Sequence, residues 1–317
     1  MDQTSELQGI IQSVTKKTRV KKWSCFYPNC NKKSSMSHSQ TKNTSLKNIA
    51  EQNNHVIQIN LNVFPIRTTR GWSTIGIDKA TRFPGFCPYH DNELFKQVDI
   101  LHMNNITNKA LANLAFRTFA LEMRKKEIMS DQSSRLLFHW NKFIDPNAAE
   151  HVHATMEGMK NCIKVTKPYY LKLFYQMIES AYYAPMIHKI FISRTNLGVS
   201  CSTFINPLDI GEYPYNKPQP QISFNILPRR DYSLIIFSSF EDTEHLMDDF
   251  INRYPRLEDI VFNFCEEVSL RISLYDTLSD KTLDIIDKAQ APWGYWEFTS
   301  VPDIFNFVLS DDSLLSN

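Results

Sequence analysis

Four residues that bind soft or borderline metal ions lie in two short segments near the start of the chain. Cys25 and Cys30 form a C-x4-C pair around Pro28. Cys87 and His90 form a C-x2-H pair. Three thiolates and one imidazole are a ligand set that tetrahedral Zn²⁺ takes in closed structural sites. The long interval between the pairs costs little, because loop-closure entropy grows only logarithmically with length. The pairs therefore predict a structural zinc site, with unrelated buried or free thiols as the alternative.

A histidine beyond the first pair could carry chemistry of its own. His38 follows Cys30 within the polar segment Met-Ser-His-Ser-Gln. Its imidazole could replace His90 as the fourth ligand, could be an exposed loop side chain, or could act as a general base beside the metal. Imidazole suits the last role because its unperturbed pKa lies near neutrality. The spacing alone leaves these three interpretations open.

Basic residues gather at the N-terminal end, although the formal net charge of the 317 residues is only +1. Within residues 1–50 the acidic residues are Asp2 and Glu6. This asymmetry is typical of a segment that contacts anions, and a solvated surface with accidental clustering would give the same pattern. The candidate contacts with nucleic-acid phosphates, beside Trp23 as a stacking ring, are Lys16, Lys17, Arg19, Lys21 and Lys22.

The elements around the two ligand pairs should hold them together. Residues 25–45 are rich in Ser, Asn, Thr and Lys, which favours metal-pinned loops over regular structure. Strict alternation over residues 56–63 predicts a half-buried strand. Beyond His90 the apolar residues recur at helical spacing, so a helix should begin directly behind the second pair. A metal knuckle that leads into a helix carrying two ligands in its first turn is a treble-clef arrangement.

Helices and strands separate along the rest of the chain. Helical periodicity covers residues 107–129 and 147–182, with an interruption at Pro168. Further on, the sequence predicts strands at 187–193, 199–205, 221–226 and 233–238, then helices at 240–254 and 257–270 and one capped by Ser279.

The pattern predicts an α+β fold: an N-terminal treble-clef, HNH-like zinc module, a helical middle, and a small C-terminal antiparallel sheet with helices. The expected organisation is a mobile basic tail at 1–20, a zinc-binding module at 21–105, a helical region at 106–184 and an α+β domain at 185–317.

Composition favours a soluble, cytoplasmic protein without a membrane partner. No apolar run approaches the roughly 18 residues that a membrane span needs. The other three cysteines, at 162, 201 and 265, lie singly in apolar or amphipathic segments. They are expected to be small buried side chains in a reducing compartment, so disulfides are the weaker account.

The spacing of these residues resembles the zinc-containing branch of the HNH (His-Me finger) endonucleases. The resemblance rests on Cys25–Cys30, on His38 and on the run Cys87–Asn92. In that family a cysteine pair precedes a catalytic histidine, and a second pair opens a helix whose next residue binds the catalytic metal. The resemblance implies that His38 activates water for attack on a phosphodiester. It further implies that Asp91 or Asn92 helps to hold Mg²⁺ or Mn²⁺, and that zinc is purely structural.

Over nearly its full length the chain also resembles a widespread, functionally uncharacterised bacterial zinc-binding family. The shared features are the C-x4-C at Cys25–Cys30, the pair Ser37 and His38 before a short helix, and Gly-Phe-Cys-x2-His-Asp at Gly85–Asp91. Later similarity covers Phe224–Pro228 and Phe262–Glu267. This family implies no particular activity.

Two functions from different classes follow. The first is a zinc-stapled, HNH-like nuclease or nuclease-derived nucleic-acid-binding protein, with bacterial stress or phage defence as its setting. The alternative is a non-catalytic zinc-finger protein whose knuckle builds an interaction surface for nucleic acid or for a protein partner. A hard-metal site beside His38 would favour the enzyme. Walker A, GxGxxG and GxSxG motifs do not occur, so nucleotide hydrolysis, dinucleotide binding and α/β-hydrolase chemistry have no support.

Overall fold

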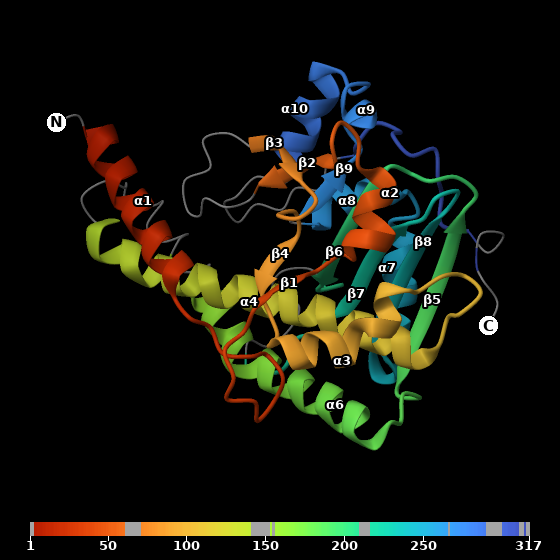
Figure 1. Ribbon diagram of the computed structural model, residues 1–317, viewed down its shortest axis with the longest axis horizontal. Helices are drawn as coiled ribbons and strands as arrows, with labels where there is room; N and C mark the ends of the chain where they lie inside the picture. Colours follow the sequence, from red (N-terminus) through yellow and green to blue (C-terminus); the bar gives the residue numbers. More distant parts are fainter. Residues whose placement is uncertain are drawn as a thin grey trace.

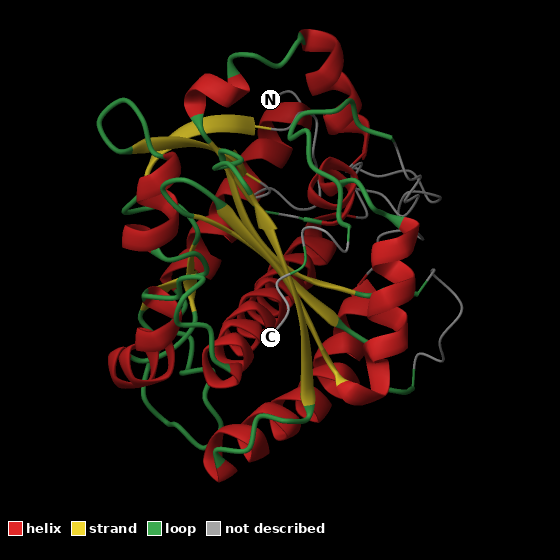
Figure 2. Cartoon of the chain, turned by 90° about the vertical axis from the view of Figure 1, so that its right-hand side faces the viewer, coloured by secondary structure: helices red, strands yellow, loops and turns green. Residues whose placement is uncertain are grey.

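A central antiparallel sheet lies between helices on both of its faces, as Figure 2 shows. The computed structural model describes residues 3–60, 71–140, 153, 156–208, 216–265, 267–289, 300–310 and 314. The predicted combination of helices with an antiparallel sheet is confirmed.

The central sheet has seven strands in the order β3-β2-β9-β6-β7-β8-β5, and every neighbouring pair is antiparallel. Strands β2 and β3 come from the N-terminal third of the chain and the other five from its C-terminal half. They join through β9, which pairs with both β2 and β6, so the sheet is larger than the small one predicted. The strands are β2 (His55–Asn60), β3 (Gly71–Gly76), β5 (Met186–Ser193), β6 (Val199–Ile205), β7 (Ile222–Pro228), β8 (Ser233–Phe240) and β9 (Val268–Leu270).

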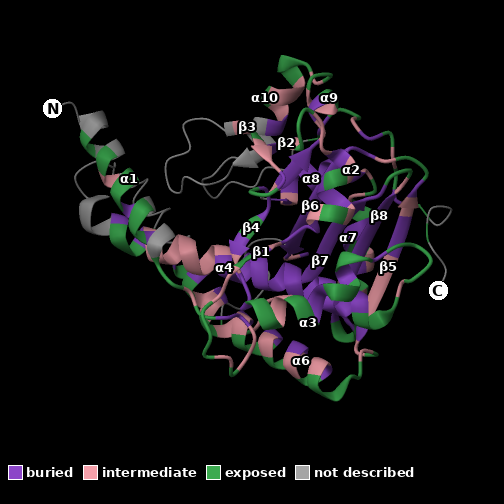
Figure 3. Cartoon of the chain, viewed as in Figure 1, coloured by how far each residue is buried: buried purple, intermediate pink, exposed green. Residues whose placement is uncertain are grey.

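The middle strands are buried on both faces, which explains their nearly continuous apolar sequences (Figure 3). In β8, Leu234 and Ile236 belong to the core on the side of α4 and α6. Ile235 and Phe237 point the other way and belong to the core on the side of α7 and α8. Successive side chains of a strand point to opposite faces, so this one strand contributes to both cores.

Three helices cover the first face of the sheet: α3 (Pro88–Asp99), α4 (Asn108–Trp140) and α6 (Lys167–Ser180). The predicted helix at 107–129 is confirmed and continues to the end of α4. Phe174 of α6 packs on Phe116 and Phe119 of α4, with ring centroids 5.1 and 5.5 Å apart. Although α4 has 33 residues, no helix in the described part of the chain is apolar enough over such a length to cross a membrane.

The opposite face carries α7 (Glu244–Arg253), α8 (Leu257–Phe264) and α10 (Asp280–Ala289). Ser279 caps α10 as predicted, because its Oγ accepts a hydrogen bond from the Thr282 N–H at 3.2 Å. The predicted helix at 257–270 is longer than α8. Helix α8 ends before Cys265, whose backbone is extended, and the last three residues of the predicted range form β9 instead.

The first twenty residues contain helix α1 (Gln3–Val20) where the sequence predicted no regular element. Val14 and Thr18, one helical turn apart, are buried. Beyond the helix, Lys21 forms an ion pair with Asp131 of α4 at 2.8 Å. Figure 1 shows α1 beside the far end of α4, and one buried face is enough to dock an otherwise polar helix.

Short elements complete the N-terminal part of the molecule. The strands β1 (Met36–His38) and β4 (Arg82–Pro84) form a separate antiparallel pair. The remaining short elements are α2 (Lys47–Ile49), α9 (Ile272–Tyr275), π-helical turns at Lys42–Leu46 and Cys162–Thr166, and a 3-10 turn at Glu241–Thr243.

Two buried polar side chains join these N-terminal loops to the sheet. The Gln40 Oε1 accepts a hydrogen bond from the Ser200 Oγ of β6 at 2.9 Å. Arg229, directly after β7, donates two hydrogen bonds to the Leu101 carbonyl at 2.6 and 2.9 Å and one to the Thr44 carbonyl at 2.6 Å. The loops and the sheet are therefore connected by satisfied buried polar groups.

Candidate metal centre and the adjacent histidine

The first ligand pair lies on a narrow loop, which we call the knuckle (residues 24–33). The loop closes at its base through a bridge between Ser24 and Lys33. At its tip the Cys30 N–H donates to the Tyr27 carbonyl at 3.2 Å, and Asn29 has a left-handed backbone with φ of 61°. Asparagine tolerates this conformation better than most residues. The turn therefore brings the two cysteine side chains of the pair to the same side of the loop.

The second ligand pair lies at the start of α3. Cys87 is the N-cap, with extended backbone, and Pro88 occupies the first helical turn, where a missing N–H costs nothing. His90 follows within the same turn. The preceding Phe86 is fully buried and packs on Phe95 at 4.9 Å between ring centroids, which anchors the helix start in the core.

All four predicted ligands come together, and their ligand atoms lie within 4.8 Å of one another. The Nδ1 of His90 is 3.4 Å from the Sγ of Cys25 and 3.5 Å from that of Cys87. The Sγ atoms of Cys30 and Cys87 are 4.0 Å apart. A tetrahedral ion with Zn–S of about 2.3 Å and Zn–N of about 2.0–2.1 Å requires ligand atoms about 3.6–3.8 Å apart. The cluster therefore fits a structural metal such as zinc.

Backbone N–H groups surround the sulfurs. The Cys87 N–H donates to the Cys25 Sγ at 3.2 Å. Burial raises the pKa of the Cys25 thiol to about 12. Burial acts in the same direction on Cys87, but it is outweighed by hydrogen bonds from the His90 backbone, from the Cys25 and Cys30 side chains and from the Tyr89 backbone, so the net pKa of Cys87 is lowered. A cation at the centre of the cluster would favour all three thiolates, because a coordinated thiol is deprotonated.

Aromatic and cationic side chains hold the ligands in place from outside. The ring of Tyr27 stacks on His90 with centroids 4.1 Å apart, and its hydroxyl donates to Glu179 of α6. Arg124 of α4 is buried, donates to the Ser24 carbonyl at 2.7 Å and lies over the Phe26 ring. Burial lowers the pKa of His90, so its imidazole is neutral and able to bind a metal at neutral pH.

His38 lies outside this cluster, on strand β1. It is half-buried, it pairs in register with Arg82 of β4, and its Nε2 is shielded from solvent without a hydrogen-bond partner among the described residues. Burial lowers the pKa of His38, and the charges of Arg82 and Arg117 lower it further. The backbone of Asp78 and the charge of Asp91 act in the opposite direction. The imidazole is therefore neutral at neutral pH.

Asp91 is half-buried in the first turn of α3, and its Oδ1 likewise lacks a hydrogen-bond partner in the described chain. Its charge acts on His38, which places the two side chains in one electrostatic neighbourhood. Arg117 of α4 belongs to the same neighbourhood: its Nη2 binds Asp99 at 2.9 Å, while its buried Nε is without a partner in the same part of the chain. Three unpartnered buried polar atoms thus occur around β1, α3 and α4.

The other predicted site residues have varied surroundings. Asn92 is exposed, and its side chain donates to Glu93 at 3.3 Å. Among the predicted nucleic-acid contacts, Lys16, Lys17 and Lys22 are exposed. Lys21 is exposed too and forms the ion pair with Asp131 described above. The side chain of Arg19 lies outside the described residues.

Sequence reasoning missed Arg117 and Tyr27. Arg117 lies between Phe116 and Phe119 in a largely apolar part of the sequence, and a cation at such a position is a signal of a buried polar role. Tyr27 lies within the first ligand pair, but no spacing rule connects it to Glu179, which is far away in the sequence.

Comparison of the chain with protein-family models, with curated proteins and with solved structures finds no match.

Proposed function

We propose that the protein is a nuclease in which a structural zinc ion staples the knuckle to α3 and His38 with Asp91 hydrolyses phosphodiester bonds. The observation that carries this proposal is the neighbourhood of His38 and Asp91, where each has a buried polar atom without a partner in the described residues. Unpaired buried polar groups are costly, and each calls for an explanation such as an ordered water, an ion or a role in a reaction.

The chemistry assigns a separate task to each residue. The neutral His38 accepts a proton from water through Nε2 while the water oxygen forms a bond to phosphorus. The bond from phosphorus to the leaving sugar oxygen breaks, and that oxygen leaves with a proton from solvent. Asp91 supplies a carboxylate oxygen, which Mg²⁺ and Mn²⁺ prefer as a ligand. Such an ion, when bound, polarises the scissile phosphate and stabilises the leaving oxygen.

The order of elements supports this assignment. A knuckle with two ligands precedes the β1–β4 pair that carries His38, and α3 follows with the last two ligands and Asp91. This succession agrees with the treble-clef and HNH-like arrangement that the sequence resembles. The exposed Lys16, Lys17 and Lys22 supply positive charge for contacts with a nucleic-acid backbone.

A second candidate is a non-catalytic binding protein with the same zinc staple. The observation in its favour is that the Nε2 of His38 and the Oδ1 of Asp91 are both shielded from solvent. A substrate could reach these atoms only after side chains move. In the binding protein the two polar groups would be structural, and the knuckle would present a surface to nucleic acid or to a protein.

Cleavage assays separate the two functions. The purified protein is incubated with plasmid and with labelled single-stranded DNA in the presence of Mg²⁺ or Mn²⁺. His38→Ala is compared with His102→Ala, a control at an exposed histidine. The nuclease predicts cleavage that His38→Ala lowers by about 10²–10⁴-fold and that the control leaves intact, because a general base contributes a factor of this size. Equal cleavage by wild type and His38→Ala would contradict the catalytic role.

A further inference from the structure

The tyrosine next to the candidate ligand His90 is largely exposed. Tyr89 lies in the first turn of α3, between Pro88 and His90, and 62% of its surface is accessible. A single exposed ring is ordinary on a protein surface, and what distinguishes Tyr89 is its place between a candidate metal ligand and the lysines of the knuckle.

The ring of Tyr89 is held by its neighbours. It meets the His90 ring edge-on with centroids 5.2 Å apart, and His90 in turn stacks on Tyr27. Tyr27 continues the row to Tyr175 of α6 at 5.8 Å. The metal cluster fixes His90, so the ring at the end of this row is pre-oriented. A ligand that stacks on Tyr89 loses little free energy to the ordering of the side chain.

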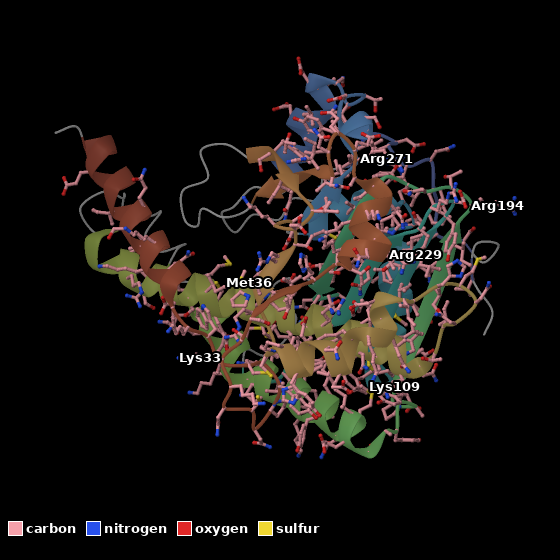
Figure 4. All side chains as sticks on the ribbon, in the orientation of Figure 1. Lys33, Met36, Lys109, Arg194, Arg229 and Arg271 are labelled. Atoms are coloured by element: carbon pink, nitrogen blue, oxygen red, sulfur yellow. The ribbon has the colours of Figure 1, made fainter. Side chains whose placement is uncertain are left out.

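Positive charge accompanies the ring. The Nζ of Lys32 lies 5.7 Å from the Tyr89 ring centroid, and Lys33, the next residue on the knuckle, is exposed as well (Figure 4). We call Tyr89, Lys32 and Lys33 the knuckle face.

We propose that the knuckle face binds single-stranded nucleic acid, with an unpaired base stacked on Tyr89 and phosphates near Lys32 and Lys33. This inference rests on the proposed function in taking nucleic acid as the ligand. An exposed aromatic ring beside cations is the arrangement that stacks one base face and neutralises the adjacent backbone. In a duplex the base faces are occupied by their neighbours, so a stacking ring favours a single strand.

The test is binding of a fluorescently labelled oligodeoxythymidine of about 16 nucleotides, a length suited to single-strand binding sites. Fluorescence anisotropy is recorded without added Mg²⁺ or Mn²⁺, and a duplex of the same length serves for comparison. Tyr89→Ala should weaken single-strand binding about tenfold, whereas Tyr89→Phe should retain it, because stacking needs only the ring. The matched control is Tyr182→Ala, at a tyrosine that is also 62% exposed but follows α6.

A salt titration tests the charged part of the knuckle face. Lys32→Gln and Lys33→Gln should each reduce the slope of log affinity against log salt by roughly 0.7, the value for one single-strand phosphate contact. Lys109→Gln, at the exposed lysine that Figure 4 labels on α4, should leave the slope unchanged. Metal content is measured for every variant, so that loss of the fold is recognised.

The inference is overturned if Tyr89→Ala binds as tightly as Tyr182→Ala, or if duplex and single strand bind equally. If Tyr89 served a protein partner instead, Tyr89→Ala would not change the affinity for DNA. The two proposals can fail separately. If cleavage depends on His38 but Tyr89→Ala does not weaken binding, this inference is wrong and the proposed function is still supported. Binding that depends on Tyr89 without any cleavage would support this inference and contradict the nuclease activity of the proposed function.

Discussion

The knuckle and the central sheet differ in what stabilises each of them. The metal cluster is built from the knuckle, which forms no helix or named strand, and from the start of α3, and its four ligand side chains converge within 4.8 Å. In the sheet, every residue of β6, β7 and β8 is buried between two apolar cores. A cation bound in the first region would favour the thiolates that coordinate it and would hold their loops together, whereas the second region is stable through apolar burial. One chain therefore combines a candidate metal centre with a packed sheet.

Phe26 of the knuckle belongs to the same apolar core as Leu234 and Ile236 of β8, and polar side chains join the loops that follow the knuckle to the sheet. Gln40 binds β6, and Arg229 reaches from the end of β7 to the loops around Thr44 and Leu101. Variants can therefore affect the knuckle alone, the sheet alone or the junction.

The largest expected effect comes from removal of a metal ligand. Cys87→Ser should lose the bound metal and disorder the knuckle, because binding and folding are coupled at such sites. We expect loss of one metal equivalent and a fall in Tm on the order of 10 °C. Metal analysis and thermal unfolding measure both. The control is Cys162→Ser, a buried cysteine outside the cluster, which should keep its metal. Wild-type metal content in Cys87→Ser would refute the assignment.

A core truncation should give the opposite pattern. Phe237 of β8 is fully buried and packs on Phe224 of β7 with ring centroids 4.8 Å apart. Phe237→Ala should lower the free energy of unfolding by about 3–5 kcal/mol, since it leaves a cavity. Its metal content should stay at the wild-type level, and Phe237→Leu should cost less. If Phe237→Ala released the metal under native conditions, the two regions would not be separable.

The junction should show an intermediate effect. Burial lowers the pKa of Arg229 to about 10, which still leaves the guanidinium charged at neutral pH. Arg229→Lys keeps the charge but cannot serve the carbonyls of Leu101 and Thr44 together, so we expect a loss of about 1–3 kcal/mol in chemical denaturation. The exposed neighbour provides the control, because Arg230→Lys should change stability by less than about 0.5 kcal/mol. Equal effects of the two variants would argue against the junction.

The smallest effect concerns acid sensitivity of the sheet. Burial lowers the pKa of His188 on β5 to about 4, and its Nδ1 hydrogen-bonds the Ser238 Oγ at 2.8 Å. Between this pKa and the unfolded value of about 6.5 the unfolded chain binds more protons, so stability falls as the pH drops. We expect His188 to contribute a loss of about 1 kcal/mol between pH 7 and pH 5.5. In chemical denaturation over this range, the free energy of unfolding of His188→Gln should depend less steeply on pH than that of the wild type. An equal slope for the two proteins would exclude the contribution of His188.

Local spacing in the sequence was enough to predict the parts of the site that local chemistry determines. The two ligand pairs and the helix behind the second pair follow from short spacings and from Pro88 in the first helical turn. The strand β6 coincides with the predicted range 199–205, because an apolar run of that length is typical of a buried strand.

Features that depend on distant parts of the chain escaped sequence analysis. The residues Val268–Leu270 continue an apolar helical pattern, yet they form β9 because β2 and β6 offer hydrogen-bonding edges on both sides. The polar residues of α1 gave no periodic signal, since only one narrow face packs on α4. Likewise, Arg117 and Asp91 come near His38 through the packing of α3 on α4 and of α4 on β4, the strand that pairs with β1.

The most direct test of the central claim, that the metal staple and the reactive histidine are separate, is the metal content of three purified proteins. Wild type and His38→Ala should each contain one equivalent of zinc per chain, whereas His90→Ala should have lost most of it, because His90 completes the ligand set and His38 lies outside it. Loss of zinc from His38→Ala with retention in His90→Ala would contradict the account.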